Sequence, residues 1–249
     1  MAVVGGGPAG TCAAWEAARG GADAVVIEKG VPRDDRSGLG PDSTDAAGML
    51  DYWVDIMDVD PDDLPDDVVL QELTDVDFVG PSESVTIGTT GIESSYENFG
   101  YTFQRARMDD WLRDRAEEAG ASYRVGDGVT DVETDLTGGH THTVQLASGE
   151  EIECEYLILA DGPQRTVTSR VLDRFMPRGQ EITDVVGTTE ANHIAYQEHR
   201  EVPAELFDED TLKFWWGWMP GETAYPWIFP NDETVARVGD SIGLVDEMG

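Results

Sequence analysis

Residues 2–28 read AVVGGGPAGTCAAWEAARGGADAVVIE and contain the pattern that decides the fold. A short apolar run, Ala2–Val4, ends at the glycine-rich stretch 5–10. Residues 11–19 are rich in alanine and predict a helix, and residues 24–27 predict a second buried strand that closes on Glu28. The order strand, glycine turn, helix and strand predicts a dinucleotide-binding unit at the start of an α/β fold.

Three glycines and one acid have separate tasks in such a unit. Gly5 permits the tight turn, Gly7 lets the backbone approach a pyrophosphate, and Gly10 lets helix and strand pack closely. The N-terminus of the helix offers N–H groups and a positive dipole end to phosphates. Glu28 would accept hydrogen bonds from ribose hydroxyls, which favours NAD or FAD over NADP. The motif alone does not choose between NAD and FAD, and a glycine turn without a ligand is the alternative.

The composition is strongly acidic. The 249 residues include 29 Asp and 22 Glu against 14 Arg and two Lys, for a net charge of −35. Such a field repels phosphates and argues against nucleic acid as a partner. Acids spread along the whole chain indicate a solvated surface, typical of proteins from salt-rich cells, although an ordinary acidic cytosolic protein is the alternative.

Targeting and metal signals are sparse. No run of 18 apolar residues and no basic leader before an apolar stretch is found, so we expect a cytoplasmic protein without a membrane-spanning helix. Cys12 and Cys154 stand far apart and lack ligand spacing to any histidine, so neither a disulfide framework nor a metal site is expected.

Three later segments add to the motif. Residues 101–112 read YTFQRARMDDWL and lead into a predicted helix at 113–120. Residues 156–162 read YLILADG, a buried strand followed by a predicted helix at 165–175. Residues 225–230 read YPWIFP, and alternation places Tyr225, Trp227 and Phe229 on one face of a strand. Such a concentrated aromatic face suits a long apolar ligand, and a plain sheet core is the alternative.

In this order, the segments resemble a family of flavoproteins that includes the aromatic hydroxylases. Within it, they resemble the FAD-dependent geranylgeranyl reductase family, of the digeranylgeranylglycerophospholipid reductase-like, haloarchaeal type. The resemblance covers essentially the whole chain. It implies FAD as the cofactor and a Rossmann-like FAD-binding domain interleaved with a β-sheet-rich substrate domain. It also implies reduction of isoprenoid C=C bonds in archaeal membrane lipid precursors.

The resemblance also assigns residues, although it specifies no catalytic one. Arg33 would lie near the flavin, and Arg105 would face the pyrophosphate. Arg105 and Arg107 could instead relieve an acidic surface, and Asp161 could be a helix N-cap. The implied cofactor-binding residues are Gly5, Gly7, Pro8, Ala9, Gly10, Glu28, Lys29, Arg33, Arg105, Val129, Asp161 and Gly162. The implied substrate-binding residues are Tyr225, Trp227, Phe229 and Pro230.

Two interleaved domains are expected. Residues 1–75 and 101–175 would bind FAD, and residues 76–100 and 176–249 would form the substrate sheet, with a hairpin at 76–100 and strands at 181–196 and 212–218. Residues 36–40 lack a cysteine that many reductases carry, and we expect the chain to be truncated at its C-terminus.

The predicted partners are an isoprenoid lipid and an electron donor, which is either reduced ferredoxin or NAD(P)H. A peripheral contact with a membrane is also predicted. Two other readings stay open. One is an FAD-dependent aromatic-ring monooxygenase with the same fold, and the other is a truncated, non-catalytic chain. Long apolar walls in the substrate site would favour the reductase, and a polar pocket would favour the monooxygenase.

The acidic composition generates the first prediction. Self-repulsion among the carboxylates should loosen the fold when the screening length grows from about 3 Å at 1 M salt to about 10 Å at 0.1 M. We therefore expect the melting temperature to rise steeply with KCl up to molar concentrations, as calorimetry would measure. A flat profile between about 0.1 and 2 M would contradict the salt-adapted interpretation.

Overall fold

The computed structural model describes residues 1–31, 47–59, 61–138, 141–187, 193–201, 208–218, 225–231 and 235–243. The chain divides into two compact units. The first unit comprises residues 1–40 and 109–190, and the second comprises residues 41–108 and 191–249. The functional division into FAD-binding and substrate domains stays a prediction.

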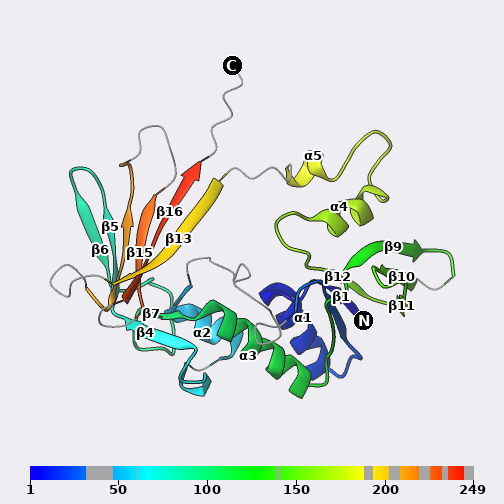
Figure 1. Ribbon diagram of the computed structural model, residues 1–249, viewed down its shortest axis with the longest axis horizontal. Coiled ribbons are helices and arrows are strands. Elements are labelled where there is room, and N and C mark those ends of the chain that lie inside the picture. Colours follow the sequence, from blue (N-terminus) through cyan, green and yellow to red (C-terminus); the bar gives the residue numbers. More distant parts are fainter. Residues whose placement is uncertain are drawn as a thin grey trace. The chain divides into compact units, whose positions relative to one another are not determined.

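A parallel sheet with strand order β12-β1-β2-β8 forms one layer of the first unit (Figure 1). Its strands and adjoining helices are β1 (Ala2–Val4), α1 (Pro8–Arg19), β2 (Val25–Glu28), α3 (Arg105–Glu118), β8 (Ser122–Val125) and β12 (Leu157–Leu159). Small residues allow α1 to approach the sheet closely, since Ala14 and Ala18 are buried against Val3 and Val26. The predicted strand, helix and strand at residues 2–28 are therefore confirmed.

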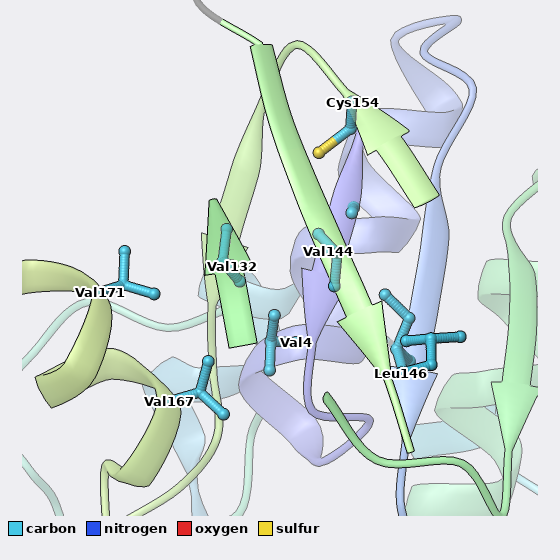
Figure 2. Packing of buried hydrophobic residues seen from close by; sticks show 9 residues of the cluster. Val4, Val132, Val144, Leu146, Cys154, Val167 and Val171 are labelled. Carbon is cyan, nitrogen blue, oxygen red and sulfur yellow. The ribbon is translucent and has the colours of Figure 1, made fainter. Parts of the chain in front are cut away.

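An antiparallel sheet with order β11-β10-β9 forms the second layer of this unit. Its elements are β9 (Val129–Asp135), β10 (Thr141–Leu146) and β11 (Glu151–Cys154), followed along the chain by α4 (Thr166–Asp173) and α5 (Thr183–Val186). Figure 2 shows the shared core, in which Val167 of α4 lies with Val4, Val132 and Val144. Arg174, directly after α4, donates hydrogen bonds to the Asp131 carboxylate at 2.7 and 2.8 Å, which ties the helix to β9.

The second unit contains a six-stranded sheet of order β13-β16-β15-β14-β5-β6 and a three-stranded sheet of order β3-β7-β4. The larger sheet comprises β5 (Asp75–Val79), β6 (Ser84–Ile87), β13 (His193–Glu201), β14 (Thr211–Trp215), β15 (Pro226–Pro230) and β16 (Val235–Gly243). The smaller sheet comprises β3 (Gly48–Leu50), β4 (Val69–Leu73) and β7 (Gly100–Phe103), accompanied by α2 (Asp51–Met57) and the 3-10 helix η2 (Pro61–Asp63). The predicted hairpin at 76–100 is β5 with β6, and it joins the strands after residue 176 in one sheet, as expected.

Close contacts join the two sheets of the second unit. The fully buried Thr102 hydroxyl of β7 donates a hydrogen bond to the Pro230 carbonyl oxygen of β15 at 2.6 Å. Gly48 of β3 lies so near the Phe229 ring that a Cβ there would come within 2.8 Å of it. The absence of a side chain at Gly48 therefore lets the aromatic ring enter the space between the sheets.

Two element predictions differ from the structure. Helix α3 begins at Arg105 and not at residue 113, because Met108, Leu112 and Ala116 form a buried stripe at four-residue spacing that starts before 113. The strand predicted at 181–196 is wrong over its first part, where α5 lies, and β13 begins only at His193. A hydrogen bond from the Ile182 N–H to the Asp173 carboxylate, 2.7 Å long, holds this segment against the end of α4. Within the described ranges, no helix combines the length and apolar character needed to cross a bilayer.

The contact between the two sheets generates a stability prediction. Thr102→Val keeps the side-chain shape but removes the buried donor to Pro230, so we expect a loss of roughly 1–3 kcal/mol in the free energy of unfolding. Thr86→Val is the matched control, because the Thr86 hydroxyl bonds Asp77 on the exposed strand β6; it should cost less than about 0.5 kcal/mol. Denaturant unfolding measures both, and equal costs would contradict the buried link.

Candidate functional site

The glycine turn between β1 and α1 has no room for side chains at two of its positions. Gly5 has a φ of +99°, and a Cβ there would lie 2.2 Å from the Ala160 carbonyl oxygen. A Cβ on Gly10 would lie 1.9 Å from the Gly5 carbonyl oxygen. The roles predicted for these glycines, a tight turn and close packing of helix on strand, therefore follow from the contacts.

Gly7 differs from its neighbours, because it faces open space. A Cβ built on Gly7 meets nothing within 4 Å, and its φ of −72° is accessible to any residue. The absence of a side chain at Gly7 thus serves neither the turn nor the packing of this unit. It leaves a bare backbone at the N-terminus of α1, where the N–H groups and the helix dipole attract a phosphate.

Glu28 ends β2 beside this turn. One of its oxygens accepts a hydrogen bond from the Gly6 N–H at 2.7 Å, and the other accepts one from the Gly30 N–H at 2.6 Å. A carboxylate has about four acceptor sites, so two remain for the ribose hydroxyls that the sequence predicts. Glu28→Ala would remove the ribose acceptor and the support of two loops together, so this variant cannot separate the two roles.

A cavity of about 400 Å³, here called the nucleotide cavity, opens at the carboxyl ends of β1, β2 and β12. This edge is where open α/β sheets bind their ligands. Its described lining residues are Val4, Gly5, Gly7, Ile27, Glu28, Lys29, Gly128, Val129, Ala160, Asp161, Gly162, Gln164, Thr166 and Val167. Seven of the predicted cofactor-binding residues meet here, namely Gly5, Gly7, Glu28, Lys29, Val129, Asp161 and Gly162.

Asp161 also has a structural role. Its carboxylate accepts hydrogen bonds from the Val167 N–H at 2.6 Å, the Thr168 N–H at 3.2 Å and the Thr168 hydroxyl. It thereby caps α4, since the residue at the N-cap, Arg165, makes no side-chain cap bond. The helix-cap alternative is confirmed, and the cap holds α4 as a wall of the nucleotide cavity.

The other predicted cofactor residues lie elsewhere. Pro8 and Ala9 form the first turn of α1, and Gly10 is buried within that helix. Arg105 begins α3 within the second unit, and its contact with a pyrophosphate stays a prediction. Arg33 falls outside the described residues. Three apolar wall residues, Val4, Ile27 and Val167, were not predicted from the sequence. The first two lie at the ends of predicted strands, which would have indicated them.

Cys12 follows the glycine turn on α1. Burial raises the pKa of its thiol, and the negative charges of Asp109 and Glu16 raise it further. The thiol is therefore protonated at neutral pH, and the reactive thiolate form is disfavoured.

The second unit contains a separate cavity of about 390 Å³, here called the apolar cavity. Its described lining residues are Gly48, Leu50, Val76, Phe78, Ile87, Thr89, Thr90, Phe99, Leu212, Phe214 and Phe229. Phe78 and Phe214 stack with ring centroids 5.6 Å apart, and Phe229 meets Phe214 edge-on at 5.7 Å. Two threonines are the only polar side chains among these described lining residues. The chemistry of the cavity therefore suits an apolar ligand.

The four predicted substrate residues occupy different places. Phe229 lines the apolar cavity. Tyr225 stacks on Trp216 at 4.8 Å, and Trp227 is buried beside Tyr225, with ring centroids 6.1 Å apart. Pro230 is buried, and its carbonyl accepts the Thr102 hydroxyl. The aromatic rings share one face as predicted, and the substrate contacts of all four residues stay a prediction.

Comparison with known proteins places this geometry in a family. The model described as tryptophan halogenase matches residues 46–186, more than half of the chain. The chain belongs to this family. A second model, described as an NAD(P)-binding Rossmann-like domain, matches residues 3–53, which include the glycine turn and Glu28.

Individual relatives and solved structures resemble this chain over most of its length. Digeranylgeranylglycerophospholipid reductase 1 of Methanosphaera stadtmanae is 25% identical over 96% of this chain and 53% of its own length. A geranylgeranyl bacteriochlorophyll reductase-like protein from Thermoplasma acidophilum superposes with a TM-score of 0.73 at 22% identity, over 98% of this chain and 56% of that structure. A myxobacterial chondrochloren halogenase, described as FAD-dependent, gives 0.61 at 19% identity, over 98% and 52%.

These findings confirm the predicted fold class, the relationship to geranylgeranyl reductases, and FAD as the cofactor of the family. The chain spans about half the length of the curated relatives it matches.

The glycine turn generates a binding prediction. Gly7→Val puts a branched side chain into open space without backbone strain, so we expect a nearly unchanged melting temperature but loss of FAD binding, because the pyrophosphate can no longer reach the backbone. Gly10→Ala, in contrast, should destabilise the fold, since its Cβ would collide with the Gly5 carbonyl. Flavin fluorescence measures FAD binding, and calorimetry measures the melting temperature of the two variants. A Gly7→Val variant that binds FAD like the parent would contradict the binding of FAD in the nucleotide cavity.

Proposed function

We propose that this chain carries the cofactor and substrate sites of an FAD-dependent oxidoreductase that reduces isoprenoid C=C bonds of membrane lipid precursors. The apolar cavity is the observation that carries the proposal. Its lining is aromatic and aliphatic, and two threonines are the polar side chains of its described part. Such a lining suits a hydrocarbon chain. The names of the related geranylgeranyl reductases point to the same class of substrate.

An isoprenoid double bond offers no charge or hydrogen-bonding group, so shape and apolar contact must position it. The cavity provides both. Phe214 is held between Phe78 and Phe229 by ring contacts, and Leu212 is buried beside them. Because these rings support one another, the walls keep their shape when a flexible chain enters, which lowers the entropic cost of binding.

The nucleotide cavity would hold FAD through the residues that line it. The bare backbone at Gly7 and the N-terminus of α1 would take the pyrophosphate, and Glu28 would take the ribose. When bound, reduced FAD would supply a hydride to one carbon of the alkene, and a proton would complete the reduction at the other carbon. The part of this chain is to orient the cofactor and to exclude water from the substrate.

The aromatic-ring monooxygenase is the second candidate, since the family is described by a halogenase that takes an aromatic substrate. A polar aromatic ring needs hydrogen-bonding groups in its site to fix its orientation. The apolar cavity presents only Thr89 and Thr90 from the described residues, and the Thr90 hydroxyl already donates to Asp51 at 2.9 Å. This lining favours the isoprenoid.

The proposal has further parts that the sequence suggested. The electron donor would be reduced ferredoxin or NAD(P)H. The protein would work in the cytoplasm and would contact the membrane peripherally, because its lipid substrate resides in the membrane. Its acidic surface would be adapted to high salt. The net charge of −35 supports the last of these.

The apolar cavity generates a substrate prediction. Ile87 lines the cavity and is 37% exposed, so Ile87→Trp should plug the entrance with little cost in folding. Binding of geranylgeranyl diphosphate, measured by calorimetry in molar KCl, should weaken at least about tenfold, which corresponds to 1.4 kcal/mol. FAD binding should stay unchanged.

Val85→Trp is the matched control. Val85 lies on the same face of β6, is 56% exposed, and is not among the described lining residues. It should bind the prenyl probe like the parent. If both variants bound the probe equally well, the apolar cavity would not be the substrate site. If the parent bound an aromatic acid but no prenyl chain, the monooxygenase would replace the reductase.

A further inference from the structure

One end of the larger sheet in the second unit, here called the sheet tip, is poor in charge. It comprises residues 79–85, 215–218 and 225–226, where β5 turns into β6 and where β14 lies beside β15. Figure 1 shows the β5–β6 turn at the end of the sheet that lies away from β4 and β7. Charged residues make up 27% of the chain, yet Glu83 is the only one among these residues. The sheet tip can therefore leave water without the desolvation of many charges.

One face of the sheet tip continues the wall of the apolar cavity. Phe78 and Phe214 line that cavity. Trp216 meets the Phe78 ring edge-on at 6.4 Å and stacks on Tyr225 at 4.8 Å. Val85 lies opposite Phe78 in the strand register and is 56% exposed. An apolar surface therefore leads from the cavity to the exposed end of the sheet.

The other face of the sheet tip carries an open apolar groove of about 350 Å³. Since side chains alternate along a strand, Trp215 projects from the face opposite to that of Phe214. Trp218 is held at the groove by a hydrogen bond of 3.0 Å from its Nε1–H to the Val79 carbonyl oxygen. Aromatic side chains thus occupy both faces of one sheet end. The described lining residues of the groove are Trp215, Trp218, Pro226, Trp227 and Ile228.

This distribution over two faces restricts what covers the sheet tip. Trp216 is 48% exposed and Trp218 is 52% exposed. A protein that docks on one face leaves the other in water, whereas the interfacial region of a bilayer surrounds an inserted sheet end from both sides. Tryptophan and tyrosine are enriched in that region. Trp216 lies two residues, or about 7 Å, beyond Phe214, and interfacial segments enter a membrane to a depth of roughly 5–10 Å.

We propose that the sheet tip inserts into the surface of a lipid bilayer, with Trp216 and Trp218 at the level of the headgroups. Insertion brings the apolar surface that leads to the apolar cavity into contact with the lipid. The proposal rests on the proposed function, because the membrane would supply the isoprenoid lipid. The contact is apolar and not electrostatic, since the net charge of −35 repels anionic headgroups. Binding therefore strengthens as salt screens this repulsion.

Flotation with phosphatidylcholine vesicles in molar KCl tests the insertion. We expect the parent to bind, and Trp216→Ser and Trp218→Ser each to weaken binding about tenfold, because each removes a large apolar side chain from the bilayer surface. Trp216→Phe should stay bound. Brominated phosphatidylcholine quenches tryptophans that touch the lipid, so Trp216→Phe should show less quenching than the parent at equal binding. FAD binding should be the same in all variants.

Trp53→Ser is the matched control, because Trp53 is 40% exposed on α2 and lies outside the sheet tip. It should bind vesicles like the parent. Equal vesicle binding by the parent and both serine variants of the sheet tip would overturn the insertion. So would a parent that binds geranylgeranyl diphosphate but no vesicles, which would leave the proposed function in place.

Two further outcomes separate the occupants and the two proposals. If the parent forms dimers that the sheet-tip serine variants lose, and floats with no vesicle, the surface belongs to a second copy of the chain and the insertion is overturned. A parent that binds vesicles through the sheet tip but does not bind geranylgeranyl diphosphate would support the insertion and reject the proposed substrate.

Discussion

Both oxygens of the Glu28 carboxylate are held by backbone amides, those of Gly6 in the glycine turn and Gly30 in the following loop. These two bonds fix the turn relative to the end of β2, and so they determine where a ligand can meet the backbone at Gly7. The same carboxylate lines the nucleotide cavity. The position of Glu28 thus governs the turn and the proposed recognition of ribose.

The walls around this point are held by polar contacts as much as by apolar ones. Asp161 caps α4, and Arg174 ties the end of that helix to β9. The apolar core shared by α4 and the strands lies between these two contacts (Figure 2). The second unit relies instead on aromatic packing, with Phe229 admitted by the missing side chain at Gly48.

Much of the site was predictable because its residues are close in sequence. The turn, α1 and Glu28 lie within 28 residues and follow local rules, namely glycine where a Cβ cannot fit and an acid at a strand end. The boundary of α3 was missed although Met108, Leu112 and Ala116 carry the helical period. The first part of the strand predicted at 181–196 is wrong because its valines favour strands locally, whereas the contact of Ile182 with Asp173 turns this segment back on α4.

The sequence by itself determined the dinucleotide motif, the parallel strands around it, the acidic surface and the aromatic face of β15, since each depends on composition or on spacing along one segment. Only the tertiary structure decided which residues enclose the cavities. Lining residues such as Val4, Gly128 and Thr166, or Gly48, Ile87 and Phe214, come from strands, a loop and a helix far apart in the chain. The physical reason is that a cavity is bounded by contacts between distant segments, and no local pattern encodes those contacts.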